Sequence, residues 1–317
     1  MDYRSLGATG IRVSRLCLGA LTISPLQRDM PVNEGARVIT RALELGVNFI
    51  DTSQFYRVYP PIAQALEWYS GRDDVVIATK SYAYEASGMR LALEEALRDL
   101  NRDHIDIFML HEQESMLTIK GHWEAVEYLL KAKERGLVRA VGISTHTVRG
   151  VRAAALVPEL DVISPLINYA GIGIADGNRD DMVAAIDFAA ACGKGIYAMK
   201  PFGGGHLMDR IDDALAFLLD MDNLASIAVG MKSRAEVEMN VRLFSGQPVP
   251  ESLRAAARVM PRRLHIDDWC IGCGTCVAKC PSQAMELKNG RAVVDPSRCV
   301  FCGYCGAHCP EFAVKVI

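Results

Sequence analysis

Hydrophobic and polar positions along residues 13 to 245 follow one repeating pattern. Short apolar runs alternate with longer segments whose apolar residues recur at helical spacing, as do Trp123, Val126 and Leu129. We expect eight strands, within Val13–Leu21, Val47–Ile50, Val75–Ala78, Ile105–Leu110, Leu137–Ile143, Val162–Ile167, Gly195–Met199 and Ala225–Val229. Eight strand–helix units in about 250 residues are typical of a (β/α)8 TIM barrel. The rival is a doubly wound open sheet, but its glycine-rich turn after the first strand is missing.

Turn residues refine this prediction. Residues 2–12, with Gly7 and Gly10, could form a small hairpin that plugs the bottom of the barrel. Asn33 could cap the first helix. Three glycines stand where a helix should hand over to a strand: Gly46, Gly136 and Gly193. Gln247 to Pro250 reads as a linker, with a short helix continuing to about Met260. We therefore expect a barrel over 1–246, a linker and helix over 247–261, and a second domain over 262–317.

The second domain carries a repeated cysteine motif. Cys-x2-Cys-x2-Cys-x3-Cys-Pro occurs twice, at residues 270–281 and 299–310. In such runs three thiolates hold one [4Fe–4S] cluster and the fourth ligates the other cluster. One cluster would use Cys270, Cys273, Cys276 and Cys309; the other would use Cys299, Cys302, Cys305 and Cys280. Structural zinc is the alternative, but zinc prefers paired Cys-x2-Cys units and would leave the middle cysteine of each triple unused. Strands Ala284–Leu287 and Ala292–Val294 should flank an Asn289-Gly290 turn. This stretch resembles bacterial two-cluster ferredoxins, which implies a small α+β domain.

Composition narrows the function classes. The 317 residues are 50% hydrophobic with a net charge of −3, and no basic block suggests a nucleic acid or an anionic membrane as partner. The N-terminus carries no apolar signal segment, and the apolar stretch Met182–Cys192 is too short to span a membrane. Cys17 and Cys192 lie in apolar surroundings and should be core residues. We expect a reducing, cytoplasmic location.

Ionisable residues stand at the ends of three successive predicted strands. Asp51 ends the second, with Tyr56 five residues on; Lys80 ends the third and His111 the fourth. Singly, Asp51 could be a helix cap, Lys80 a solvated strand end and His111 a core imidazole. Catalytic groups of TIM barrels gather at this end of the strands, so four such groups together indicate an active site.

These stretches resemble the aldo-keto reductase family. Besides the strand ends, the match includes Tyr3 to Gly7, Ala78-Thr79-Lys80, Leu110-His111 and Val138 to Ser144. The resemblance assigns a catalytic tetrad to Asp51, Tyr56, Lys80 and His111. Tyr56 would be the general acid, with its pKa lowered by the Lys80 ammonium, which Asp51 would hold in place. His111 would orient the substrate carbonyl.

The same resemblance implies NADPH as the hydride source. Its contacts would fall on Gly19, Ala20, Ser144, Thr145, Ser164, Asn168, Met199, Lys200, Phe202, Gly204, Gly230, Lys232, Ser233, Glu236 and Asn240. Lys232 and Ser233, at a helix N-terminus, suit a 2′-phosphate, although a solvated helix cap has the same residues. Several positions depart from the family pattern. Thr145 and Ser164 replace the usual amide side chains, Met199 replaces a stacking tyrosine, and Arg57 follows Tyr56.

Two functional hypotheses follow. The first is an NADPH-dependent oxidoreductase that reduces an aldehyde or ketone to an alcohol and carries two [4Fe–4S] clusters for electron transfer. The second is a redox-coupled NADP(H)-binding electron-transfer protein with little carbonyl turnover. The first implies a small carbonyl or alcohol substrate, and a ferredoxin or another redox protein is a candidate partner. NADPH oxidation against a panel of carbonyl compounds would separate the two hypotheses.

Overall fold

Eight parallel strands close into a barrel in this computed structural model, which describes residues 1–317 except 26, 259–262, 281–283, 297–298, 300–303 and 317. The strand order around the barrel is β10-β3-β4-β5-β6-β7-β8-β9. The strands are β3 Leu16–Gly19, β4 Phe49–Asp51, β5 Val76–Ser81, β6 Ile105–Leu110, β7 Val138–Thr145, β8 Val162–Pro165, β9 Gly195–Met199 and β10 Ser226–Gly230. Each predicted run overlaps one of them, which confirms the TIM barrel and excludes the open sheet.

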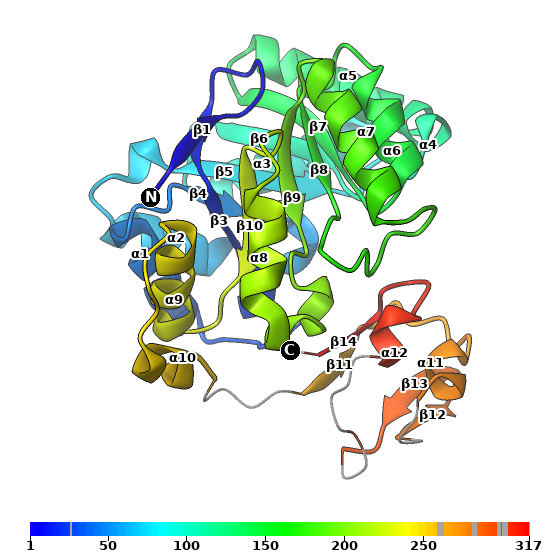
Figure 1. Ribbon diagram of the computed structural model, residues 1–317. Helices are drawn as coiled ribbons and strands as arrows, with labels where there is room; N and C mark the ends of the chain where they lie inside the picture. Colours follow the sequence, from blue (N-terminus) through cyan, green and yellow to red (C-terminus); the bar gives the residue numbers. More distant parts are fainter. Residues whose placement is uncertain (26, 259–262, 281–283, 297–298, 300–303, 317) are drawn as a thin grey trace.

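Helices on the outside connect these strands, and α9 and α10 follow the last one (Figure 1). They are α1 Val32–Glu44, α2 Tyr59–Trp68, α3 Ala86–Asp99, α4 Met116–Gly121, α5 Trp123–Glu134, α6 Val148–Ala155, α7 Arg179–Ala191, α8 Ile211–Leu219, α9 Arg234–Phe244 and α10 Glu251–Arg258. The expected cap was wrong: Pro31, not Asn33, is the N-cap of α1. Gly46, Gly136 and Gly193 all have positive φ angles beyond helix ends, as predicted.

The N-terminal hairpin closes the bottom of the barrel. Strand β1 (Tyr3–Ser5) pairs with β2 (Arg12–Ser14). The first predicted strand, Val13–Leu21, was therefore too long, because it joined the end of β2 to β3. Leu6 and Ile11 are buried in the same apolar cluster as inward-facing residues of the barrel strands. Gly7 has φ +53° and lies against the backbone of Gly195, where β9 begins.

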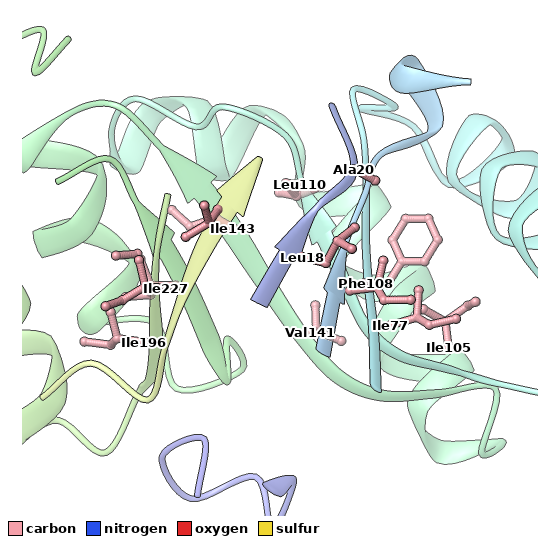
Figure 2. Close-up of a cluster of buried hydrophobic side chains, with 14 of the residues drawn as sticks. Leu18, Ala20, Ile77, Ile105, Phe108, Leu110, Val141, Ile143, Ile196 and Ile227 are labelled. Carbon is pink, nitrogen blue, oxygen red and sulfur yellow. The ribbon is translucent and has the colours of Figure 1, made fainter. Parts of the chain in front are cut away.

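A second, larger apolar cluster fills the layer between strands and helices. Figure 2 shows its strand side chains, among them Leu18, Ile77, Phe108 and Ile143, all buried. They pack against the apolar faces of the surrounding helices, such as Val126 and Leu129 of α5. This packing fixes the positions of the strand ends, where the polar residues lie.

The described residues of the C-terminal domain form two small antiparallel sheets and two short helices. Strand β11 (Leu264–Ile266) pairs with β14 (Val314–Val316), and β12 (Met285–Lys288) pairs with β13 (Arg291–Val294); the helices are α11 Thr275–Ala278 and α12 Tyr304–Ala307. Asn289 and Gly290 have φ angles of 51° and 74°, which confirms the predicted two-residue turn. In Figure 1 this domain, orange to red, lies at the end of the barrel opposite the N-terminal hairpin.

The two cysteines outside the repeated motif differ in their exposure. Cys17 is fully buried, but Cys192 is exposed at the end of α7, so its assignment to the core was wrong. Apolar neighbours in the sequence did not bury it because the helix ends there and turns toward solvent. In the described part of the chain, none of the helices is both long and apolar enough to cross a bilayer.

Candidate active site

A buried ion pair lies at the centre of the barrel mouth. Lys80 at the end of β5 places its Nζ 2.6 Å from Oδ2 of Asp51, at the end of β4, and 2.8 Å from the carbonyl oxygen of Thr52. The Lys80 side chain is only 1% exposed. Tyr197, inside the barrel on β9, donates a second hydrogen bond of 2.6 Å to the same carboxylate oxygen. The ammonium and the carboxylate therefore hold one another in a fixed position, as the sequence predicted for this pair.

Tyr56 lies directly above this pair. It ends a short 3-10 turn (Gln54–Tyr56), and the Nζ of Lys80 is 5.5 Å from the centre of its ring. The pKa of Tyr56 is raised, first by burial and then by the negative charge of Asp51. The expected lowering of the Tyr56 pKa by Lys80 was therefore wrong. Its physical reason is that Asp51 compensates the ammonium charge while desolvation disfavours the phenolate.

His111 follows β6 and faces Tyr56, with the two ring centres 5.7 Å apart. Its Nδ1 lies 3.1 Å from Oγ of Ser53, and the ring of Tyr82 stacks on it at 4.3 Å. Burial, with a contribution from Lys80, lowers the pKa of His111 to about 3. The imidazole is therefore neutral near pH 7. The structure brings all four predicted tetrad residues together.

A cavity of about 570 Å³ opens beside the tetrad, which is within the usual size of a cofactor site. Asp51 and Tyr56 line one end of it. Nine of the residues predicted to contact the nucleotide also line it: Gly19, Met199, Lys200, Phe202, Gly204, Gly230, Lys232, Glu236 and Asn240. The distribution of these residues agrees with a long ligand that extends from β9 to α9.

The other predicted contacts are not among the lining residues. Ala20 is fully buried, and Ser144 accepts a hydrogen bond of 2.9 Å from the backbone of Glu112. Thr145 bonds Thr147. Asn168 uses its amide to hold the backbone of Ile172. The side chains of Thr145 and Asn168 thus already have protein partners, and Ser164 is fully buried on β8.

At the far end of the cavity, α9 begins with a capped N-terminus. Ser233 accepts a hydrogen bond of 3.1 Å from the backbone of Glu236, whose carboxylate in turn accepts one of 2.7 Å from the backbone of Lys232. Among the described residues, Oδ1 of Asn240 is buried without a hydrogen-bond partner although Asn240 lines the cavity. A buried acceptor without a partner is costly, so this end of the cavity fits a ligand with a donor such as an amino group.

Sequence reasoning missed residues whose role depends on the fold. Tyr197 and Ser53 contact the tetrad but lie in ordinary strand and turn segments. Phe312 and Lys315 of the C-terminal domain line the barrel cavity, 200 residues and more from the tetrad in sequence. Four non-glycine residues with positive φ surround the mouth: Arg57, Glu112, Lys200 and Phe312, with φ from 50° to 58°. Such backbone is uncommon outside glycine and is concentrated at functional sites.

A second, small cavity lies inside the C-terminal domain. Cys270, Cys273, Cys276 and Cys309 all line it, the set predicted for one cluster. Burial raises the pKa of Cys276, and the nearby thiols of Cys309 and Cys270 raise it further. The backbone of Ala313 donates a hydrogen bond of 3.2 Å to the sulfur of Cys309. These residues fit an iron–sulfur cluster, whose sulfur ligands are tuned by such bonds.

The predicted second ligand set is only partly described. Cys302 lies outside the described residues, whereas Cys280, Cys299 and Cys305 are within them. The sulfur of Cys280 accepts a bond of 3.2 Å from the backbone of Ala284, in the same arrangement as Cys309 with Ala313. No group of three Cys, His, Asp or Glu residues converges on a single metal position within the described ranges. A cube of iron and sulfide keeps its thiolates farther apart than one zinc ion would.

Comparison with known proteins supports this geometry. Residues 15–214 match the model of the aldo/keto reductase family, and residues 263–310 match a 4Fe-4S dicluster domain. L-galactose dehydrogenase of Arabidopsis thaliana is 24% identical over 288 residues, covering 76% of this chain and 87% of the relative. The aldo-keto reductase YhdN of Bacillus subtilis (strain 168) is 24% identical over 279 residues, covering 78% and 82%.

Solved structures show the same barrel. An assigned aldo-keto reductase from Pseudomonas aeruginosa superposes with a TM-score of 0.66 at 28% identity, covering 77% of this chain and 94% of its own. The aldo-keto reductase AKR11C1 of Bacillus halodurans, in its holo form, also gives a TM-score of 0.66, at 20% identity, and covers 81% and 95%. Both cover a part of this chain that is close to the extent of the barrel.

Proposed function

This chain belongs to the aldo/keto reductase family, and from that premise we propose that it is an NADPH-dependent oxidoreductase that reduces an aldehyde or ketone to an alcohol. One observation carries the proposal. Lys80 is buried between Asp51 and the Thr52 carbonyl, directly beneath the ring of Tyr56 and next to His111. An ion pair with a purely structural role would not require a phenol and a neutral imidazole beside it, as Tyr56 and His111 lie here.

The roles of the tetrad follow from these contacts. Tyr56 donates its proton to the carbonyl oxygen as that oxygen becomes an alkoxide, which is general acid catalysis. Lys80 stabilises the phenolate that remains, and Asp51 holds Lys80 with the help of Tyr197. His111 orients the substrate oxygen. For its Nε2 to carry the donated proton, Nδ1 must be an acceptor. The Ser53 hydroxyl, 3.1 Å away, would then donate to Nδ1 in place of the Lys80 carbonyl oxygen, to which it donates at 3.2 Å.

NADPH would supply the hydride. The fit of its site rests on the size of the barrel cavity, on the unpartnered Asn240 oxygen and on the basic residues along its wall. We assign the adenine end to Glu236 and Asn240, the 2′-phosphate to Lys232 and Ser233, and the pyrophosphate to the Gly203–Gly205 turn. Met199 and Lys200 would lie beside the nicotinamide, with Gly19 and Gly230 opposite.

For the C-terminal domain we propose two [4Fe–4S] clusters with crossed ligands. Cys270, Cys273, Cys276 and Cys309 would hold the first, and Cys299, Cys302, Cys305 and Cys280 the second. With this assignment we propose a barrel domain over 1–246, a linker and helix over 247–261, and a cluster domain over 262–317. Eight thiols reserved for iron also favour a reducing compartment such as the cytoplasm, and a ferredoxin or another redox protein as electron partner.

A second candidate function keeps the same ligands but little carbonyl turnover. It is favoured by Lys200, which has φ +58° and places its Nζ 3.8 Å from the ring centre of Phe312 in the cluster domain. In this candidate the barrel binds NADP(H) and the clusters transfer electrons for another protein.

The replacement Tyr56→Phe tests the proposal. Removal of the general acid should lower the turnover of NADPH with a reactive aldehyde by about 10²–10⁴-fold. NADPH affinity, measured by fluorescence, should stay the same because the hydroxyl is the only group removed. Tyr84→Phe, an exposed tyrosine near the mouth, is the matched control and should keep full activity. Retention of activity by Tyr56→Phe contradicts the tetrad; NADPH binding by the wild type without turnover of any carbonyl supports the second candidate.

A further inference from the structure

One short segment of the C-terminal domain separates the barrel cavity from the cluster cavity. Glu311, Ala313 and Val314 line the cavity that holds Cys270, Cys273, Cys276 and Cys309. Phe312, Lys315 and Val316 line the barrel cavity together with Asp51 and Tyr56. Side chains of this one segment therefore line both cavities. We refer to residues 311–316 as the shared wall.

The shared wall is packed tightly onto the barrel. A Cβ atom on Gly205 would lie 1.7 Å from the carbonyl oxygen of Val316, so only glycine allows this approach. The ring of Phe312, 4% exposed, fits between the glycines of two barrel loops, Gly173 and Gly204. The Nζ of Lys200 lies 3.8 Å from the centre of the same ring. The wall therefore cannot move without disturbing the loop assigned to the pyrophosphate.

The same wall is anchored to the cluster side by a buried ion pair. Lys315, 3% exposed, pairs with Asp267, and its Nζ lies 4.6 Å from the centre of the Trp269 ring. Trp269 precedes Cys270 and donates to the carbonyl oxygen of Glu311. Across the junction its ring contacts Phe55, which precedes Tyr56, at 5.9 Å. The groups on both sides of the wall are thus in direct contact.

We propose that the shared wall makes nucleotide binding in the barrel and reduction of the nearer cluster, the one held by Cys270, Cys273, Cys276 and Cys309, thermodynamically linked. The inference rests on the proposed function. Reduction adds one negative charge to that cluster, and NADP⁺ brings phosphate charges to the other face of a single strand. Like charges at short range across a poorly solvated wall repel one another. Bound nucleotide therefore lowers the potential of the nearer cluster, and reduction weakens nucleotide binding by the same factor.

The test is a potentiometric titration of the reconstituted full-length protein, followed by electron paramagnetic resonance, with and without saturating NADP⁺. Couplings between sites are typically 5- to 150-fold. We expect about 10-fold weaker NADP⁺ binding to the reduced protein, which equals a fall of about 59 mV for one electron. Only one cluster should shift. Cys273→Ser replaces a ligand of the nearer cluster alone, so its changed spectrum identifies which signal belongs to that cluster.

A wall variant extends the test. Phe312→Leu keeps an apolar side chain but removes the ring, so it should change both nucleotide affinity and the potential of the nearer cluster. Phe188→Leu, at a half-exposed position on the outer face of α7, should change neither. The linkage would be overturned if the reduction potentials stay unchanged while fluorescence shows that NADP⁺ is bound. It would also be overturned if the potentials of both clusters shift equally. If the protein binds no NADP⁺, or if its iron content is enough for only one cluster, the proposed function itself is overturned. If Phe312→Leu does not fold, the wild-type titration still decides.

Discussion

Charges buried at the barrel mouth set the chemistry at the scale of single residues. The Asp51–Lys80 pair is taken out of water, and burial of two ions is favourable only when both are well hydrogen-bonded. Here Thr52 and Tyr197 supply the additional bonds. Loss of one partner from such a pair typically costs about 3–5 kcal/mol of stability. Replacements at Lys80 or Asp51 therefore affect folding as well as catalysis, which makes Tyr56 the cleaner position to test.

Lys232 provides a test of nucleotide choice. If its ammonium binds the 2′-phosphate, Lys232→Ala should weaken NADPH binding far more than NADH binding. A hydrogen bond to a charged group contributes about 1.5–3 kcal/mol, or roughly 10- to 100-fold in affinity. Fluorescence titration of both nucleotides measures this difference. Lys120→Ala, an exposed lysine on α4, is the control and should leave both affinities unchanged. Equal losses for NADPH and NADH in the Lys232 variant would show that this lysine does not read the phosphate.

Lys200 predicts a pH dependence. Burial, then the charge of Lys315, lowers the pKa of Lys200 to about 7, against the attraction of Glu112. The lysine is charged below this value and neutral above it, and an anionic nucleotide binds the charged form better. NADH affinity should therefore fall as the pH rises through about 7. NADH is the appropriate ligand because it lacks the 2′-phosphate, which itself titrates near pH 6.

Lys200→Arg is the matched variant, since a guanidinium stays charged throughout this range. Its NADH affinity should be constant between pH 6 and pH 8, approximately the range over which the wild type changes. A pH dependence that persists in Lys200→Arg would show that Lys200 is not the titrating group.

At the scale of elements, the barrel strands and the sharp turns after them together position the catalytic side chains. Beta strands fix where Asp51, Lys80 and His111 lie, and left-handed residues then turn the chain sharply away. Arg57 follows Tyr56 and Glu112 follows His111, both with positive φ. These turns keep the catalytic side chains at the mouth rather than continuing the strand. The strain is tolerated because the barrel around it is closed and fully packed.

The N-terminal hairpin offers a stability test of the same kind. Gly7 and Gly10 both have positive φ, but a Cβ on Gly7 would lie 2.3 Å from the backbone of Gly195, whereas one on Gly10 meets nothing within 4 Å. Gly10→Ala should cost about 1–2 kcal/mol, the backbone term alone. Gly7→Ala adds a clash with the backbone and should cost clearly more. Urea unfolding of the two variants measures the difference, and equal costs would show that the hairpin does not plug the barrel tightly.

At the scale of the whole molecule, the cluster domain completes the barrel. A plain barrel would leave the mouth open to solvent, but here Phe312, Lys315 and Val316 form part of its cavity wall. The extra domain is therefore placed where it affects both the ligand and the catalytic residues. Lys200 of the barrel contacts this domain directly, through the ring of Phe312.

Crossed ligation is the prediction that belongs to this scale. Cys309→Ser should damage the cluster held by Cys270, Cys273 and Cys276 rather than that of its own run, because Cys309 lines their cavity. Cys280→Ser should damage the other cluster. Iron analysis and electron paramagnetic resonance after anaerobic purification distinguish the two. Damage confined to the run that contains the replaced cysteine would contradict the crossed assignment.

The sequence by itself determined the elements and most of the candidate chemistry. Eight apolar runs predicted the barrel because buried parallel strands need continuous apolar residues, and the repeated cysteine spacing predicted the cluster ligands because chelation requires fixed separations. Asp51, Lys80 and His111 could be grouped from one chain because parallel strands in a barrel end at one rim. These features could be predicted because they depend on residues close together in sequence, or on a barrel topology in which all the strands run in the same direction.

Only the tertiary structure decided which distant residues share an environment. Tyr197 reaches Asp51 across 146 positions of sequence, and Phe312 reaches Lys200 from another domain. Neither contact produces a periodic pattern in the sequence, because both depend on how distant strands, loops and domains pack together. The pKa of Tyr56 was misjudged for the same reason: the ammonium nearby could be read from the sequence, but its compensation by Asp51 and the loss of water could not. Desolvation is a property of the folded surroundings, and the shared wall exists only once both domains are in place.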